Sequence, residues 1–191
     1  LNLTNEVMGK IGITDDDVED VAKQALNDIM QEICQSGNFT WLYGNSSFIT
    51  VAPYSTGTVT VTEASATVTG AGTTFTSGMV GRKFYCANAT YTISAYVGAG
   101  EITLSTVYAG DSGSGIAYKI YQDEYSLASD VEDVLAMRQE NNPQKLEKHG
   151  YEEMDEYWPL RSSFGYPSIY SIVGYDSSGY MKVAAYPVPN Q

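Results

Sequence analysis

The residues most suited to chemistry are the single histidine, His149, and a group of carboxylates that follows it at Glu152, Glu153, Asp155 and Glu156. A Ser–His–Asp centre would have to use His149, because the chain has one histidine. No serine stands in a nucleophile-elbow pattern, and the histidine falls in a polar loop before a predicted helix. The carboxylates are spread around that helix, whereas glycoside hydrolysis needs two of them in one cleft. We therefore expect the protein not to be an enzyme.

Metal and nucleotide sites also lack the spacing they require. Three consecutive aspartates begin at Asp15, but no glycine and no closing glutamate follow at the positions of a calcium loop. Cys34 and Cys86 fall in a helical and a strand pattern, and with one histidine they are too few ligands for zinc. The glycine-rich turns at 70–72 and 110–115 lack the Lys-Ser/Thr and the helix of a phosphate loop. We expect no cofactor, no metal and two free thiols.

Charge is unevenly distributed along the 191 residues. Residues 1–40 carry eight acidic and two basic side chains, residues 41–122 three of each, and residues 123–191 twelve and five, which gives a net charge of −13. Phosphate binding needs clustered Lys and Arg, so we do not expect the chain to seek nucleic acid. No apolar run approaches the roughly 20 residues of a membrane span. The chain starts without Met and ends in YPVPNQ, so we expect it to be trimmed or partial.

The N-terminal part predicts two helices and a strand. Residues 3–11 favour a short helix. Residues 15–36 favour a longer one, because apolar residues recur there at three- and four-residue steps and Gly37 follows. A helix with one apolar face must pack on another element or another subunit. Residues 47–51 predict a strand.

The neutral middle of the chain, residues 57–121, predicts about six short strands joined by turns rich in Gly, Ala and Ser. Beyond Tyr125, residues 129–138 favour either a helical turn or a strand, and residues 145–148 favour a strand. Residues 150–158 favour a short helix that Pro159 stops. Two further strands are predicted at 168–173 and 180–186. The predicted fold class is α+β. N-terminal helices and a short C-terminal helix-and-strand frame, residues 1–54 and 122–191, carry a small antiparallel β-barrel or sandwich inserted at 55–121.

The frame contains, in order, an acidic amphipathic helix (Val18–Ile33), then QSGNFTWLY, YSLASDVEDVLAMR, a short helix ending at Trp158, and the stretches GYPSIY and YPVP. This order resembles the head–tail connector (adaptor) proteins of tailed bacteriophages. The middle segment, TVTVTEASATVTGAGTTFTSGMVGRKF, is similar to the small β module found in many phage structural proteins.

The resemblance implies a virion structural protein of the neck or tail region, assembled in the host bacterial cytoplasm. It would form a ring of copies, commonly twelve, beneath the portal protein and would also bind a downstream tail or neck protein. Genome DNA would pass through without specific binding, because a negative lumen repels phosphates. The candidate contacts with other copies and partners are apolar or aromatic: Val18, Val21, Leu26, Ile29, Trp41, Tyr43, Trp158, Tyr166 and Tyr170.

Two other interpretations stay open. In one, the chain is a binding module of a virion or a cell surface, and its β domain recognises carbohydrate or a receptor. In the other, the chain is a hydrolase whose site has no recognised motif.

Overall fold

The computed structural model describes residues 16–37, 43–140, 142, 144–159 and 163–190. Contacts divide the chain into two compact units, residues 1–46 and 47–191. The helix predicted at 3–11 lies outside the described residues. The predicted division into a frame and an inserted domain at 55–121 stays a prediction.

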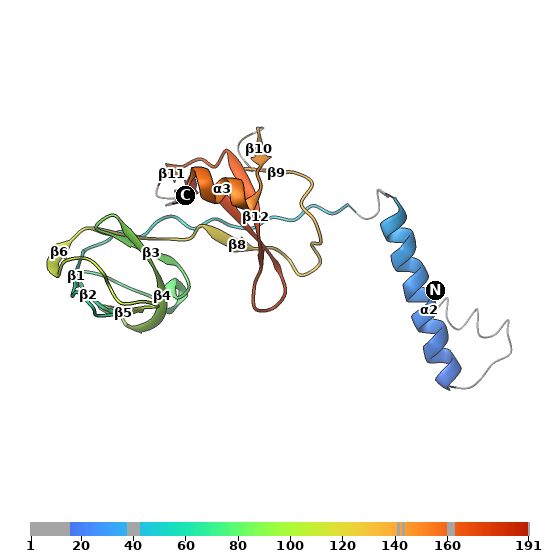
Figure 1. Cartoon of the computed structure of the whole chain (residues 1–191), viewed down its shortest axis with the longest axis horizontal. Helices are drawn as coiled ribbons and strands as arrows, with labels where there is room; N and C mark the ends of the chain where they lie inside the picture. Colours follow the sequence, from blue (N-terminus) through green and yellow to red (C-terminus); the bar gives the residue numbers. More distant parts are fainter. Residues whose placement is uncertain (1–15, 38–42, 141, 143, 160–162, 191) are drawn as a thin grey trace. The chain divides into compact units, whose positions relative to one another are not determined.

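The first unit contains the helix α2 (Asp16–Ser36) (Figure 1). This confirms the long helix predicted at 15–36. In the last turn the Ser36 Oγ donates a hydrogen bond to the Ile33 carbonyl oxygen at 2.9 Å. No glycine or proline interrupts the helix, so the apolar residues stay on one face over its whole length.

The second unit begins with a seven-stranded antiparallel sheet that rolls up into a barrel (Figure 1). Its strands are β1 (Thr58–Val61), β2 (Thr67–Ala71), β3 (Lys83–Cys86), β4 (Ala89–Gly98), β5 (Glu101–Leu104), β6 (Gly113–Ile116) and β7 (Tyr118–Tyr121). The strand order is β6-β1-β2-β5-β4-β3-β7. The two edge strands, β6 and β7, are consecutive in the chain and separated only by Ala117, so the sheet nearly closes. The short strands predicted in this region are confirmed.

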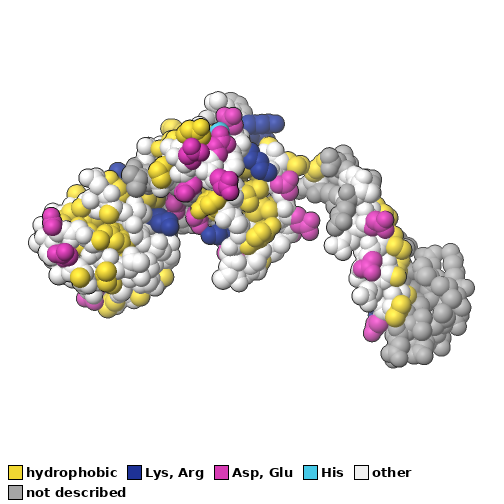
Figure 2. All heavy atoms as spheres, viewed as in Figure 1, with side chains coloured by type: hydrophobic (Ala, Val, Ile, Leu, Met, Phe, Trp, Pro, Cys, Tyr) yellow, Lys and Arg dark blue, Asp and Glu magenta, His cyan; other side chains and the backbone are white. Residues whose placement is uncertain are grey.

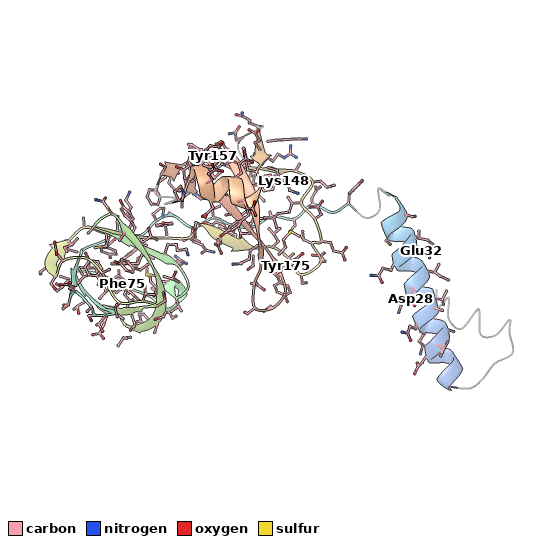
Figure 3. All side chains as sticks on the ribbon, viewed as in Figure 1. Asp28, Glu32, Phe75, Lys148, Tyr157 and Tyr175 are labelled. Carbon is pink, nitrogen blue, oxygen red and sulfur yellow. The ribbon has the colours of Figure 1, made fainter. Side chains whose placement is uncertain are left out.

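In β1, β3 and β5 every second side chain fills the barrel interior, as the two-residue period of a strand requires. Val59 and Val61 point inward from β1, and Ile102 and Leu104 from β5. An aromatic group closes the core: Phe84 stacks on Tyr118 with 5.7 Å between ring centroids, and Phe75 meets the same tyrosine edge to face at 5.9 Å. Figure 3 labels Phe75 among the barrel strands. The Tyr118 hydroxyl donates to the Thr56 carbonyl oxygen at 2.6 Å, which ties the segment before β1 to the barrel.

The rest of the second unit is built on a five-stranded sheet with the order β8-β13-β12-β10-β9. The strands are β8 (Glu124–Ser126), β9 (Met137–Arg138), β10 (Lys145–Lys148), β12 (Ile169–Tyr175) and β13 (Met181–Tyr186). Two short strands, β11 (Phe164–Gly165) and β14 (Val188–Pro189), pair beside it. β10 runs parallel to β12, and the other pairs of the five-stranded sheet are antiparallel.

Parallel neighbours need a crossover connection, and the short helix α3 (Tyr151–Tyr157) lies in that connection and packs on β12. Met154 of α3 is fully buried and contacts a second core that contains Ile169 and Ala184. The helix ends where Trp158 leaves the helical conformation, one residue before Pro159. The short helix and the two C-terminal strands predicted from the sequence are confirmed.

The predicted fold class is wrong. Among the described residues there are two α-helices, α2 and α3, and one short 3-10 helix, η2 (Ser77–Met79), and the region 122–191 is mainly sheet. Helices therefore do not frame an inserted β domain. The stretch 129–138 contains no helix and ends in the short strand β9, whose partner β10 begins seven residues later at Lys145. Residues 47–51 form no strand.

Candidate interaction surfaces

The most prominent apolar surface in the first unit is one face of α2. The α2 apolar face consists of Val21, Ile29, Met30 and Ile33, whose exposed fractions are 66%, 53%, 53% and 43%. Leu26 is half-buried. Figure 2 shows hydrophobic side chains along one edge of α2 and acidic side chains on the other. A single exposed apolar residue needs no explanation, but a contiguous stripe on a helix marks a contact surface.

Acidic side chains border the α2 apolar face. Asp28 and Glu32 lie one turn apart, and Figure 3 labels both on α2. The helix carries six carboxylates and one lysine, Lys23. Side-by-side packing of two identical α2 helices would bring like charges together, which costs free energy. A surface other than a second α2 is therefore the better electrostatic match for this face.

The predicted contact residues fall into four groups. Val21, Leu26 and Ile29 lie on α2 as expected, and Tyr43 and Tyr166 are exposed. Trp158 is half-buried against Tyr186, with 5.3 Å between ring centroids. Tyr170 is only 2% exposed, and burial raises the pKa of its hydroxyl, so its ring contributes to the core. The side chain of Val18 and the whole of Trp41 lie outside the described residues.

Sequence reasoning did not single out the hairpin between β12 and β13 as a candidate contact surface. Tyr175 and Tyr180 flank its turn and are 66% and 40% exposed, and Figure 3 labels the first of them near the tip. Asp176 holds the turn: its Oδ1 accepts backbone N–H bonds from Ser178 at 2.8 Å and Tyr180 at 2.9 Å. Its Oδ2 accepts from the Ser126 hydroxyl at 2.7 Å, which lowers the pKa of the carboxyl together with the backbone bonds. The two tyrosines near a Ser-Ser-Gly turn were the available sequence signal.

His149 lies between a carboxylate of β10 and a carboxylate of α3. Its Nδ1 lies 3.1 Å from Glu153 Oε2, and its Nε2 lies 3.8 Å from Glu147 Oε2. The imidazole and the Trp158 ring meet almost at right angles, with 5.9 Å between centroids. A catalytic triad needs a serine hydroxyl at one ring nitrogen, but here both nitrogens face carboxylates. The histidine therefore joins β10 to α3.

A small polar cleft lies near the start of β3. Its wall includes Arg82 and Lys83 from the barrel, Asp123 and Glu124 from the β7–β8 region, and Lys182 from β13. Lys182 Nζ forms an ion pair with Glu124 Oε2 at 2.7 Å. Asp123 is buried in the same wall. The sequence shows Arg82 and Lys83 as adjacent cations, but it does not show that the fold brings the other three groups to them.

The described residues contain no group of three or more His, Cys, Asp or Glu side chains that could hold a metal ion. Both cysteines are free; Cys86 is buried, which raises the pKa of its thiol, and Cys34 is half-buried. Neither α2 nor α3, the helices within the described ranges, is long and apolar enough to span a bilayer. No protein-family model matches the chain, and no similar curated protein and no similar solved structure was found.

Proposed function

We propose that the protein is a head–tail connector of a tailed bacteriophage, which acts by assembly and not by catalysis. Copies of the chain form a ring of twelve beneath the portal protein and join the capsid to a downstream neck or tail protein. The α2 apolar face contacts a neighbouring copy in the ring. Trp158 and Tyr166 belong to the surfaces that meet the other copies and partners.

The observation that carries the proposal is the exposure of the α2 apolar face. Burying one large aliphatic side chain stabilises a contact by about 1.5–3 kcal/mol, and four half-exposed ones offer a substantial part of that each. Because the face is bordered by carboxylates, its docking site on the next copy is a different surface, as in a head-to-tail contact. Contacts of that type generate rings when the rotation closes.

The net charge of −13 supports the second part of the proposal, passage of DNA without binding. Carboxylates dominate the chain outside residues 41–122, and a lumen lined by them repels the phosphate backbone. The resemblance in the order of the frame segments supports the choice of a connector over other ring-forming proteins.

The test is the mass of the full chain in solution, measured by light scattering after size exclusion. One copy weighs 20.8 kDa. We expect an oligomer whose mass reaches a plateau as concentration rises, because a closed ring stops growing. Added salt strengthens assembly, since it screens the repulsion between acidic copies. A monomer at all concentrations that also fails to bind isolated portal rings would contradict the proposal, and glycan-array binding by that monomer would favour the carbohydrate-binding interpretation.

A further inference from the structure

The polar cleft beside β3 has a volume of about 280 Å³. This volume lies at the lower end of the range for small-molecule pockets, so the cleft can admit a single side chain or a small molecule. Gly78 and Gly81 form part of the wall, and a Cβ at Gly81 would meet no atom within 4 Å. The cleft is therefore open along the backbone that leads into Arg82.

Two cations in the wall lack a carboxylate partner among the described residues. Glu124 is neutralised by Lys182, whereas neither Arg82 nor Lys83 takes part in any ion pair within the described ranges. Asp123 contributes one further negative charge to the wall. Summed over these five groups, the wall carries three positive and two negative charges and is cationic in an acidic protein.

Arg82 also has an unsatisfied donor. Its Nε is buried and has no hydrogen-bond partner in the structure. Because the protein covers this atom while the side chain as a whole is only half-buried, a ligand from outside the chain would reach the guanidinium through its two terminal nitrogens. The two terminal nitrogens of a guanidinium can bind the two oxygens of one carboxylate side by side.

We propose that this cleft is a carboxylate-binding site, in which Arg82 binds the two oxygens and Lys83 supplies the second positive charge. A singly charged carboxylate fits the excess of one positive charge better than a dianionic phosphate does. The volume accommodates either a free small carboxylic acid or one Asp or Glu side chain of another polypeptide. The site is independent of the ring contact proposed for α2.

The test is hydrogen–deuterium exchange of the full chain, read in the peptides that cover 78–83 and 122–124. The small-acid probe is sodium acetate, compared with sodium chloride at the same ionic strength. The polypeptide probe is a capped pentapeptide with one glutamate between glycines and serines, compared with its glutamine counterpart. The variants are Arg82→Gln and Arg82→Lys, and Lys119→Gln is the matched control because it removes one cation from the barrel outside the cleft wall.

We expect acetate and the glutamate peptide to slow exchange in both segments in a saturable way, while chloride and the glutamine peptide do not. Arg82→Gln should weaken the effect at least about tenfold, Arg82→Lys should give a smaller loss, and Lys119→Gln should stay within about twofold of the wild type. If the glutamate peptide reaches half of its maximal protection at an about tenfold lower concentration than acetate does, the natural ligand is a polypeptide side chain. If the two concentrations are equal, the natural ligand is a free acid. The absence of saturable protection by both probes, or an equal loss in Lys119→Gln and Arg82→Gln, would overturn the proposal. If Arg82→Gln does not fold, the same comparison rests on Arg82→Lys.

Discussion

Replacing Ile29 by glutamate should break the proposed contact between copies without unfolding the helix. Ile29 is 53% exposed, so a contact that covers it buries about half of a side chain whose full burial is worth roughly 1.5–3 kcal/mol. The lost burial is then about 1 kcal/mol. A carboxylate left unpaired in the contact adds at least ~1 kcal/mol more. The sum of about 2 kcal/mol corresponds to a roughly 30-fold weaker association per contact.

Two further variants separate the causes. Gln24→Glu adds the same charge to α2, but position 24 is exposed and lies about 140° around the helix from position 29. Ile29→Gln removes the apolar side chain without adding a charge, so we expect it to lose only the burial part, about fivefold in association. Glutamate is a better helix former than isoleucine, so the far-UV circular dichroism of Ile29→Glu should not show a loss of helix.

The assay is the dependence of light-scattering mass on concentration for the four proteins. Wild type and Gln24→Glu should assemble over the same range. Ile29→Gln should require more protein, and Ile29→Glu should require most. Unchanged assembly of Ile29→Glu would refute the reasoning. So would an equal loss in Gln24→Glu, because general repulsion between acidic chains would then explain the result.

Three other predictions concern the second unit and the thiols. Asp176→Ala should lower the melting temperature and raise hydrogen exchange at the β12–β13 turn, and Asp176→Asn should be less harmful. Because the folded pKa of Asp176 is lowered, the stability that its carboxylate contributes is full above the unfolded pKa of ~4 and is lost as the pH falls through the folded pKa. The higher melting temperature of the wild type relative to Asp176→Asn should therefore vanish in acid. A constant difference at all pH values would contradict this. Ile102→Ala and Met154→Ala should each lower the free energy of unfolding in urea by about 2–5 kcal/mol. Native-state hydrogen exchange should rise most in the barrel for Ile102→Ala and around α3 for Met154→Ala. A uniform rise across the second unit in both variants would contradict two separate cores. Cys86 should react with iodoacetamide at least about 100-fold more slowly than Cys34, because it is fully buried and its thiol pKa is raised; similar rates in peptide mass spectrometry would contradict its placement in the barrel core.

The barrel strands could be predicted because local residues decide them. Valines alternate with threonines along β1 and β2, and residues that tolerate a positive φ occupy the tight turns; Gly72 and Asn88 have φ values of 69° and 62°. The closure of the sheet could not be predicted in the same way. It depends on β6 and β7 pairing with β1 and β3, which are more than 30 residues away from them.

The helical frame was predicted wrongly because the signals after Tyr125 are ambiguous at short range. Ser129 and Glu132 have the spacing of a helix cap, yet no helix follows, and the segment leads instead to β9. The partners of β8 and β9 are set by long-range pairing, which overrides weak local propensity.

The candidate surfaces likewise include residues that the sequence predicts correctly and residues that it does not. The apolar residues of α2 were predicted from their period alone, because a helix displays that period directly. Tyr170 was expected on a surface, but β12 lies between β10 and β13 in the sheet and the ring is buried there. Aromatic residues suit both a core and a contact surface, so composition does not separate the two.

The most direct test of the central claim, that the protein works by assembly through α2, is a cryo-electron microscopy reconstruction of the full chain at the concentration where its mass reaches a plateau. We predict a ring with cyclic symmetry in which Val21, Ile29 and Ile33 are buried against a neighbouring copy. Particles without symmetry, or a ring in which these three side chains face solvent, would contradict the account.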